Sequence, residues 1–369
     1  MVTTARESAL IHLNHVTSTR WEACRSRWEN SPRGQVTNRH INSIRGDALN
    51  VLGYKTVQEF LNDNTGRIAT VTFLAGAGTR WKGSVEAAQK RGEAKLFDPE
   101  KPRCLAPVED LDRPGRTVPI GHYNLAAVGG IGTHFIVYSS HPDEIRSVAE
   151  NAGLVGAKFF EQTKPENLEL PLGHGDAMRQ LLPELKDSFH FIITNFGGDP
   201  NSRETIITSL LVLAAMQEAE EEFRPCGIMP TAYFADPPFP IEIDSSGLPK
   251  HFMHKKLMEG ASSSIDKGLP IQTNVGIRVY TREGLDASVF HFWNFFHKKI
   301  GYKIEGNSTN EFGLDNIDKF MAKLKRFRLL CIARPEEIIG RVKKFEDIEG
   351  FLASMRVVLG KEELEGGEE

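Results

Sequence analysis

A short glycine-containing loop followed by an arginine is the part of this sequence best suited to chemistry. Residues 74–80 read L-A-G-A-G-T-R, and Gly76 and Gly78 can adopt backbone angles that other residues avoid. Backbone N–H groups in such a loop can turn toward an anion, and Arg80 adds a planar, permanently charged fork of donors. The pattern predicts a phosphate-binding loop. Its other members are Leu74, Ala75, Ala77 and Thr79.

This loop differs from the two best-known phosphate loops. A P-loop needs Gly-Lys-Ser/Thr, whereas Gly78 is followed by Thr79 and Arg80. The dinucleotide fingerprint needs a third glycine where Trp81 stands. A glycine pair after a strand is, taken alone, more often a tight turn than a ligand site, so the residues downstream have to support the phosphate interpretation.

A single acidic residue follows a second apolar run. Residues 189–195 read F-H-F-I-I-T-N, and Asp199 comes after the two glycines that end this run. Ligands of open α/β sheets collect at the carboxyl ends of the strands, and Mg²⁺ prefers carboxylate oxygens. A lone aspartate in G-D-P-N would more often be a turn former. Its place after a core strand favours a metal ligand.

These motifs resemble the sugar-phosphate nucleotidyltransferases, also called nucleotide-diphosphate-sugar pyrophosphorylases. Residues 73–80, F-L-A-G-A-G-T-R, are similar to the family's L-x-G-G-x-G-T-R, with Ala75 in place of the first glycine. Residues 102–108, P-R-C-L-A-P-V, resemble P-K-x-L-x-P-V, with Arg103 where the family usually has lysine. The resemblance extends over roughly residues 68 to 320.

Three further segments carry the resemblance. G-H-G-D at 173–176 is typical of the UTP-using branch, T-N-V-G-I-R-V-Y at 273–280 matches the strand N-x-G-I-Y-V-F, and E-F-G-L-D-N-I-D at 311–318 resembles a segment with a second metal-binding acid. The roles that the resemblance implies are phosphate binding by Arg80, Arg103 and either Lys255 or Lys256; base and ribose contacts by Gln162, Gly173, His174 and Gly175; sugar contacts by Asn274 and Gly276; and Mg²⁺ binding by Asp199 and Asp315. A helix-capping role for Asp315 is equally open.

The resemblance implies an enzyme that joins a sugar 1-phosphate, or a similar phosphorylated compound, to a nucleoside triphosphate and releases pyrophosphate. G-H-G-D favours UTP. A non-catalytic nucleotide sensor stays open, because Arg103 replaces a lysine and the family's Glu-Lys pair is missing from the segment H-F-M-H-K-K at 251–256. A glycosyltransferase would need a D-x-D at a strand end. The one D-x-D here, Asp110 to Asp112, lies in a Pro-rich loop, which speaks against that class.

Apolar runs alternate with helical patterns in the order that a parallel sheet requires. The expected strands are 68–74, 133–140 and 189–195, and the expected helices are 119–132, 142–153 and 203–223. This alternation predicts an α/β fold, a Rossmann-like, mostly parallel sheet with helices on both faces, of the nucleotide-diphospho-sugar transferase type. The expected division is a helical N-terminal extension (1–66), a catalytic domain (67–320), and a helical C-terminal region with an acidic tail (321–369).

Composition excludes several classes of protein. The 369 residues carry 45 basic and 49 acidic side chains, a net charge of −4, which argues against a nucleic-acid partner. The four scattered cysteines suggest neither a zinc site nor a disulfide framework. The first residues are polar, and the apolar run Ile206 to Met216 is far shorter than the ~20 residues that cross a bilayer. We therefore expect a cytoplasmic protein without a membrane partner.

Overall fold

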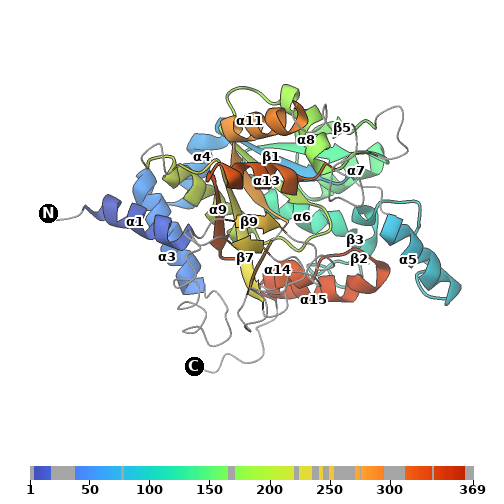
Figure 1. Cartoon of the computed structure of the whole chain (residues 1–369). Helices are drawn as coiled ribbons and strands as arrows, with labels where there is room; N and C mark the ends of the chain where they lie inside the picture. Colours follow the sequence, from blue (N-terminus) through green and yellow to red (C-terminus); the bar gives the residue numbers. More distant parts are fainter. Residues whose placement is uncertain are drawn as a thin grey trace.

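A mixed, eight-stranded β-sheet lies at the centre of the molecule (Figure 1). The structure is a computed structural model. It describes residues 4–17, 38–75, 79–164, 171–219, 224–234, 241–243, 249–252, 271–274, 276–294, 312–334 and 336–361.

One half of the sheet is parallel and the other half is mixed. The strand order is β10-β7-β11-β6-β1-β4-β5, and β12 also pairs with β7. The parallel strands are β1 (Ile68–Phe73), β4 (Thr133–Tyr138), β5 (Lys158–Glu161) and β6 (Phe191–Phe196). The others are β7 (Gly227–Phe234), β10 (Ile271–Asn274), β11 (Arg278–Thr281) and β12 (Phe327–Cys331).

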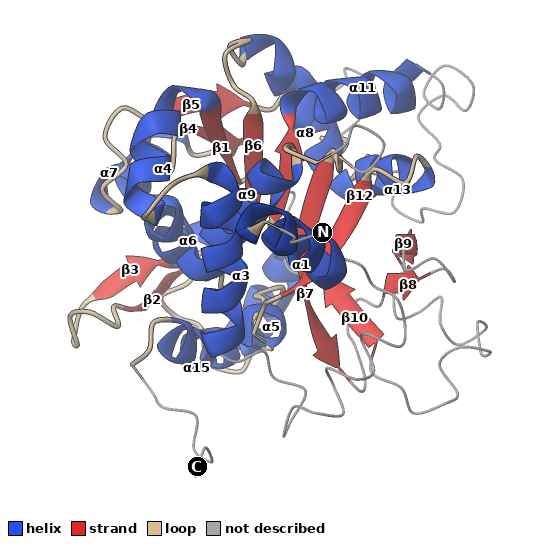
Figure 2. Ribbon diagram, turned by 90° about the vertical axis from the view of Figure 1, so that its left-hand side faces the viewer, coloured by secondary structure: helices blue, strands red, loops and turns tan. Residues whose placement is uncertain are grey.

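Helices cover both faces of the sheet (Figure 2). Successive side chains of β1 serve opposite faces, because Ile68 belongs to one hydrophobic cluster whereas Ala69, Val71 and Phe73 belong to another. The first cluster includes α1 (Ala5–Thr17), α3 (Asn38–Leu52), α4 (Val57–Asn64), α6 (Ile120–Val128), α7 (Pro142–Asn151) and α9 (Arg203–Met216). The second includes α8 (His174–Leu181), α11 (Arg282–Phe292) and α13 (Leu314–Lys323). The predicted fold class is confirmed.

The long apolar helix α9 is a core helix, as predicted. Every residue from Thr205 to Met216 is buried, and the Ser202 side chain caps the helix by accepting from the Thr205 N–H. The helix ends at Met216, earlier than the expected Phe223. Within the described part of the chain, no helix combines the length and the apolar character that crossing a membrane requires.

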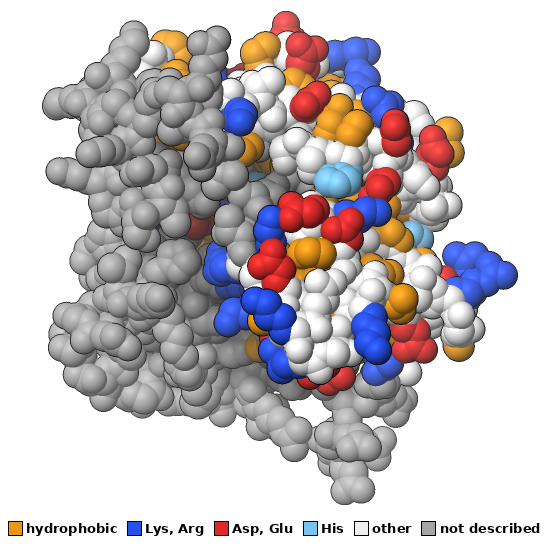
Figure 3. Space-filling view, turned by 90° about the vertical axis from the view of Figure 1, so that its right-hand side faces the viewer, with side chains coloured by type: hydrophobic (Ala, Val, Ile, Leu, Met, Phe, Trp, Pro, Cys, Tyr) orange, Lys and Arg blue, Asp and Glu red, His pale blue; other side chains and the backbone are white. Residues whose placement is uncertain are grey.

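A third hydrophobic cluster joins the segment after β1 to the C-terminal helix. It contains Trp81, Val85 and Ala88 of α5 (Thr79–Lys90), residues of the hairpin β2 (Pro107–Glu109) and β3 (Thr117–Pro119), and Phe351 of α15 (Ile348–Val358). The segment that follows the predicted phosphate loop is therefore a packed helix. An i, i+4, i+7 apolar stripe makes this stretch a helix. Figure 3 shows the side of the molecule on which α5 lies. On the described part of this side, basic and acidic side chains are interspersed.

The C-terminal region is not purely helical. Strand β12 lies parallel to β7, with Phe327 opposite Gly227 and Cys331 opposite Thr231. The region therefore adds a strand to the sheet before the helices α14 (Glu336–Ile339) and α15 begin. In a separate two-stranded sheet, β8 (Ile241–Ile243) pairs antiparallel with β9 (Pro249–Phe252), and the residues between them lie outside the described part. The division into three parts remains a prediction.

Candidate active site

The carboxyl ends of β1 and β6 meet at one edge of the sheet. The Leu74 N–H donates to Val137 O (2.8 Å), and the Gly197 N–H donates to Phe73 O (3.1 Å). Leu74 is buried and Ala75 is half-buried. Thr79 begins α5, and the exposed Arg80 lies in its first turn, where a helix N-terminus favours anions. The loop residues Gly76, Ala77 and Gly78 lie outside the described residues, as do Lys255 and Lys256.

Asp199 is buried at this edge and faces an arginine that the sequence did not suggest. Its Oδ2 lies 3.3 Å from Arg341 Nε. A Cβ added to Gly276 would lie 2.0 Å from the same oxygen, so the missing side chain of Gly276 makes room for the carboxylate. The predicted sugar contact of Gly276 remains a prediction. Asn274 ends β10, and its side chain lies outside the described part.

Arg103 connects the Asp199 loop to the C-terminal segment. Its Nη1 donates to Val342 O at 2.6 Å, and a Cβ on Gly198 would lie 2.7 Å from its Nε. The Val342 N–H in turn donates to Gly198 O at 2.9 Å. We call residues 340–344, G-R-V-K-K, the C-terminal strap. The strap crosses the end of β6 beside Asp199.

The strap brings two basic residues that sequence reasoning missed. Burial, together with the neighbouring cations Arg341, Arg80 and Arg103, lowers the pKa of Lys343 to about 8, while Asp199 opposes the shift. Burial also lowers the pKa of Arg341, against the attraction of Asp199. Arg80, Arg103, Arg341 and Lys343 therefore lie close to one another and to Asp199. The signal in the sequence was three basic residues within the four positions that follow Gly340.

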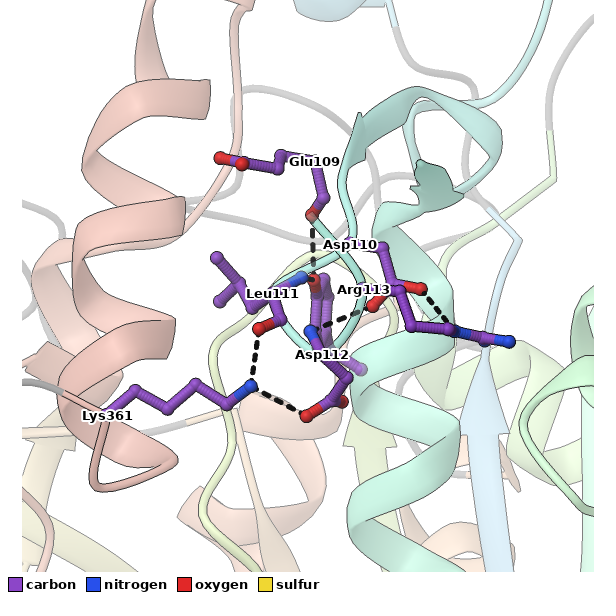
Figure 4. A network of polar contacts seen from close by, with 7 residues as sticks. Glu109, Asp110, Leu111, Asp112, Arg113 and Lys361 are labelled. Carbon is purple, nitrogen blue, oxygen red and sulfur yellow. Dashed lines mark hydrogen bonds and ion pairs between the residues drawn. The ribbon is translucent and has the colours of Figure 1, made fainter. Parts of the chain in front are cut away.

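The strap is fixed by contacts on its C-terminal side. The Phe345 N–H donates to Ser84 Oγ of α5 at 2.9 Å. At the end of α15, Lys361 Nζ donates to Asp112 Oδ1 at 2.6 Å and to Leu111 O (Figure 4). These contacts hold the C-terminal helix against α5 and the β2–β3 hairpin.

The same network engages the D-x-D of the hairpin. Arg113 Nε donates to Asp110 Oδ2 at 2.9 Å, and the Asp112 N–H donates to Asp110 Oδ1 at 2.9 Å (Figure 4). Asp112 is paired with Lys361. Both carboxylates thus serve the protein's own structure, which argues against a glycosyltransferase-type metal site here.

The predicted base-binding loop is held from two sides. Gln162 follows β5, and its Nε2 donates to Gly173 O at 2.9 Å. The Gly175 N–H donates to Phe312 O at 2.8 Å, and a Cβ on Gly175 would lie 2.8 Å from the Phe312 ring. Gly173 has φ 102°, a conformation that favours glycine. Since these donors already have partners, the base contacts assigned to Gln162 and Gly175 remain predictions that rest on their other atoms.

His174 begins α8 and lies among aromatic rings. Its ring centroid is 4.5 Å from that of Phe196 and 5.2 Å from that of Phe73. Burial, together with the nearby charges of Arg103 and Arg278, lowers the pKa of His174 to about 4. The imidazole is therefore neutral near pH 7 and is a weak base. The nucleotide contact assigned to His174 remains a prediction.

Asp315 lies in the first turn of α13, where it pairs with a buried arginine. Arg278 Nη2 is 2.5 Å from its Oδ1. The Asp315 side chain is 49% exposed, so part of the carboxylate faces away from Arg278. Asp199 and Asp315 both raise the pKa of Arg341, so both carboxylates lie near this guanidinium. The N-cap position belongs to Gly313, so the capping alternative for Asp315 was wrong.

The carboxylates at this edge of the sheet suit a metal ion that is bound together with substrate phosphates. Among the described residues, no group of three or more His, Cys, Asp or Glu side chains could hold a metal ion. Mg²⁺ is commonly bound by one or two carboxylates together with substrate phosphates. Asp199 and Asp315 are such carboxylates, and the cations around them would attract the phosphates. The residues present therefore fit Mg²⁺ bound jointly with a nucleotide.

Comparison with solved structures identifies the fold. The chain is similar to the uridine diphosphate N-acetylglucosamine pyrophosphorylase of Trypanosoma brucei, with 13% identity and a TM-score of 0.59 over 94% of this chain and 75% of that one. The fold is that of a sugar-phosphate nucleotidyltransferase. The inositol-1-phosphate CTP transferase of T. maritima is also similar, with 11% identity and a TM-score of 0.48 over 80% of this chain and 96% of that one. No protein-family model matches the sequence. No curated protein matches it either.

Proposed function

We propose that this protein is a nucleotidyltransferase that joins a sugar 1-phosphate, or a similar phosphorylated compound, to a nucleoside triphosphate and releases pyrophosphate. The observation that carries the proposal is the grouping of Arg103, Arg341 and Lys343 around Asp199 at the end of β6, beside Arg80. Two polyanions must approach each other in this reaction, so a site of several cations and few carboxylates is what the chemistry requires.

The proposed reaction is an in-line displacement at the α-phosphorus. A phosphate oxygen of the sugar phosphate forms a bond to the α-phosphorus as the bond from that phosphorus to the oxygen bridging to the β-phosphorus breaks, and pyrophosphate leaves with the electron pair. The attacking oxygen is already an anion, so no general base is needed. Arg80 and Arg103 would hold the triphosphate, and Lys343 would neutralise charge on the reacting phosphates. Bound Mg²⁺, held by Asp199 and Asp315, would supply electrostatic stabilisation.

UTP is the nucleotide that the loop G-H-G-D at 173–176 favours. The neutral His174, packed against the rings of Phe73 and Phe196, supports a contact surface for a base or ribose at this point. Lys255 or Lys256 would hold the attacking phosphate, and Asn274 with Gly276 would contact the sugar. The identity of that sugar is what a substrate panel has to establish.

The direct test measures pyrophosphate release from UTP and Mg²⁺ with a panel of sugar 1-phosphates. We expect release with at least one member, and loss of turnover with retained UTP binding in Asp199→Asn. A matched control is Asp286→Asn, which makes the same change in a carboxylate of α11 that pairs with Arg282 and should leave turnover unchanged. Tight UTP binding without release for any sugar phosphate would instead support the nucleotide sensor. Normal turnover in Arg80→Ala would contradict the assignment of the phosphate loop.

A further inference from the structure

Asp199 already has a cation beside it in this chain. Arg341 Nε lies 3.3 Å from Asp199 Oδ2, and the two side chains are 10% and 9% exposed. A carboxylate with so little access to water is costly unless a cation balances it. The proposed function places Mg²⁺ on this same carboxylate. The two cations therefore need the same partner.

We infer that Arg341 is an internal counter-cation for Asp199, which the metal must displace, and that the displaced guanidinium then binds a phosphate of the nucleotide. The inference rests on the proposed function, because it takes Asp199 as the metal ligand. It makes Arg341 a residue that changes partners during substrate binding. The metal and the nucleotide then arrive together, and metal alone binds weakly.

Two groups crowd the same oxygen of Asp199. A Cβ on Gly276 would lie 2.0 Å from Oδ2 and 2.9 Å from Cγ, so the backbone of Gly276 closes one side of the carboxylate. Arg341 stands on another side. A metal ion that approaches the carboxylate therefore competes with a cation that is tethered to the same chain.

The backbone of the strap is fixed, so the side chain of Arg341 can move while the backbone stays in place. The neighbouring residue Val342 is bonded twice, by its N–H to Gly198 O at 2.9 Å and by its carbonyl to Arg103 Nη1 at 2.6 Å. These bonds fix the backbone beside Asp199. A change of partner then needs rotation about the side-chain bonds of Arg341 alone, a small rearrangement with a defined start and end.

A nucleotide would supply the new partner. Arg341 lies near the cations Arg103, Arg278 and Lys343. This group of positive charges favours the binding of an anion. Each phosphate that enters attracts Arg341 away from Asp199 and so opens the carboxylate to the metal. Coupling of this kind is reciprocal, because whatever strengthens metal binding must also strengthen nucleotide binding.

The test measures Mn²⁺ binding without nucleotide, by electron paramagnetic resonance of the unbound ion. Arg341→Met should bind Mn²⁺ at least about 5-fold more tightly than the unsubstituted protein, in the range of ordinary coupling effects. Adding Asp199→Asn to Arg341→Met should remove this gain. The matched control is Arg91→Met, which makes the same chemical change in an exposed ion pair to Glu346 and should leave Mn²⁺ affinity unaltered.

The result that overturns the inference is equal Mn²⁺ affinity in Arg341→Met and the unsubstituted protein. Thermal unfolding checks that Arg341→Met is folded. If it is not, Arg341→Gln, which keeps a polar side chain, is measured in its place. The measurement uses neither UTP nor a sugar phosphate. A protein that gains Mn²⁺ affinity in Arg341→Met but never releases pyrophosphate would therefore refute the proposed function while supporting the inference.

Discussion

Arg278 binds two carboxylates of one helix. Its Nη2 lies 2.5 Å from Asp315 Oδ1, and its Nε donates to Asp318 Oδ2 at 2.9 Å. Burial would lower the pKa of the guanidinium, but Asp318 and Asp315 together raise it above its ordinary value. Since Arg278 belongs to β11 and both acids belong to α13, this one side chain fixes the start of α13 at the edge of the sheet.

Removing Arg278 should be costly for folding. Arg278→Met leaves Asp318, which is fully buried, without its cation, and breaking a buried pair in this way costs about 3–5 kcal/mol. Urea denaturation followed by circular dichroism measures the change. The control Arg91→Met removes a cation from exposed pairs, so its effect should be much smaller. A loss of stability in Arg278→Met no larger than in the control would contradict the role of Arg278 as an anchor.

The parallel half of the sheet was predictable because its signals are local. Ile68–Phe73 and Phe191–Phe196 are apolar, β-branched runs bounded by polar or glycine residues, and such runs read as buried strands in any context. Pro142 at the start of α7, with acids in the first turn, is a similarly local signal. Because parallel strands end at one edge, the position of Asp199 beside the end of β1 followed from these elements.

The remaining features depend on contacts that no local pattern contains. Strand β12, F-R-L-L-C, is a short apolar run that becomes a strand because β7 offers an edge to pair with. Arg341 follows Asp199 by 142 positions in the sequence, and its place beside Asp199 is set by the strap's bonds to Arg103 and Gly198. The local sequence did not predict helix α5, because it contains Gly83 and many charged residues. Trp81 and Val85 stabilise this helix through packing.

Gly276 should tolerate no side chain, because the space for one is filled by Asp199. The Cβ of Gly276→Ala would lie 2.0 Å from Oδ2, so the carboxylate has to move. A displacement of about 1 Å at a reacting site can lower turnover by the order of 10²-fold. Overpacking should also reduce the free energy of unfolding by about 1–3 kcal/mol. Pyrophosphate release and urea denaturation measure the two effects.

A matched glycine separates this local effect from the general effect of alanine. Gly83 of α5 has no atom within 4 Å of an added Cβ. Gly83→Ala should therefore raise the free energy of unfolding by roughly 0.5–1 kcal/mol, as alanine does in helices, and leave turnover unchanged. If Gly276→Ala turned over substrate as well as Gly83→Ala does, Asp199 could not have the position in catalysis that we assign to it.

Arg103 should affect nucleotide binding through both its charge and its contact with the strap. Arg103→Ala removes the charge that we assign to the triphosphate as well as the bond to Val342 O, and a hydrogen bond to a charged group is worth about 1.5–3 kcal/mol. We expect UTP to bind about 10- to 100-fold more weakly in fluorescence or calorimetric titrations. Arg103→Lys keeps the charge without the planar fork, so its affinity should be intermediate. The exposed Arg113→Ala is the control, and an unchanged Kd in Arg103→Ala would exclude this contribution.

Lys343 should make nucleotide binding depend on pH near 8. Burial, with Arg341, Arg80 and Arg103 nearby, lowers its pKa from 10.5 to about 8, so around that pH part of the population is neutral. A bound phosphate favours the charged form, so binding should take up protons at pH 8 and should weaken as the pH rises further. Calorimetry in two buffers of different ionisation enthalpy measures this uptake.

Lys343→Met should remove most of that proton uptake, and folding stability offers an independent check of its sign. Between pH 8 and 10.5 the unfolded lysine holds its proton more tightly than the folded one does. The unfolded state therefore binds more protons in this window, and the contribution of Lys343 to the free energy of unfolding rises with pH. Lys343→Met should lack this rise. Equal proton uptake and equal pH profiles in the two proteins would show that Lys343 stays fully charged and that the crowding of cations at the strap has no functional consequence.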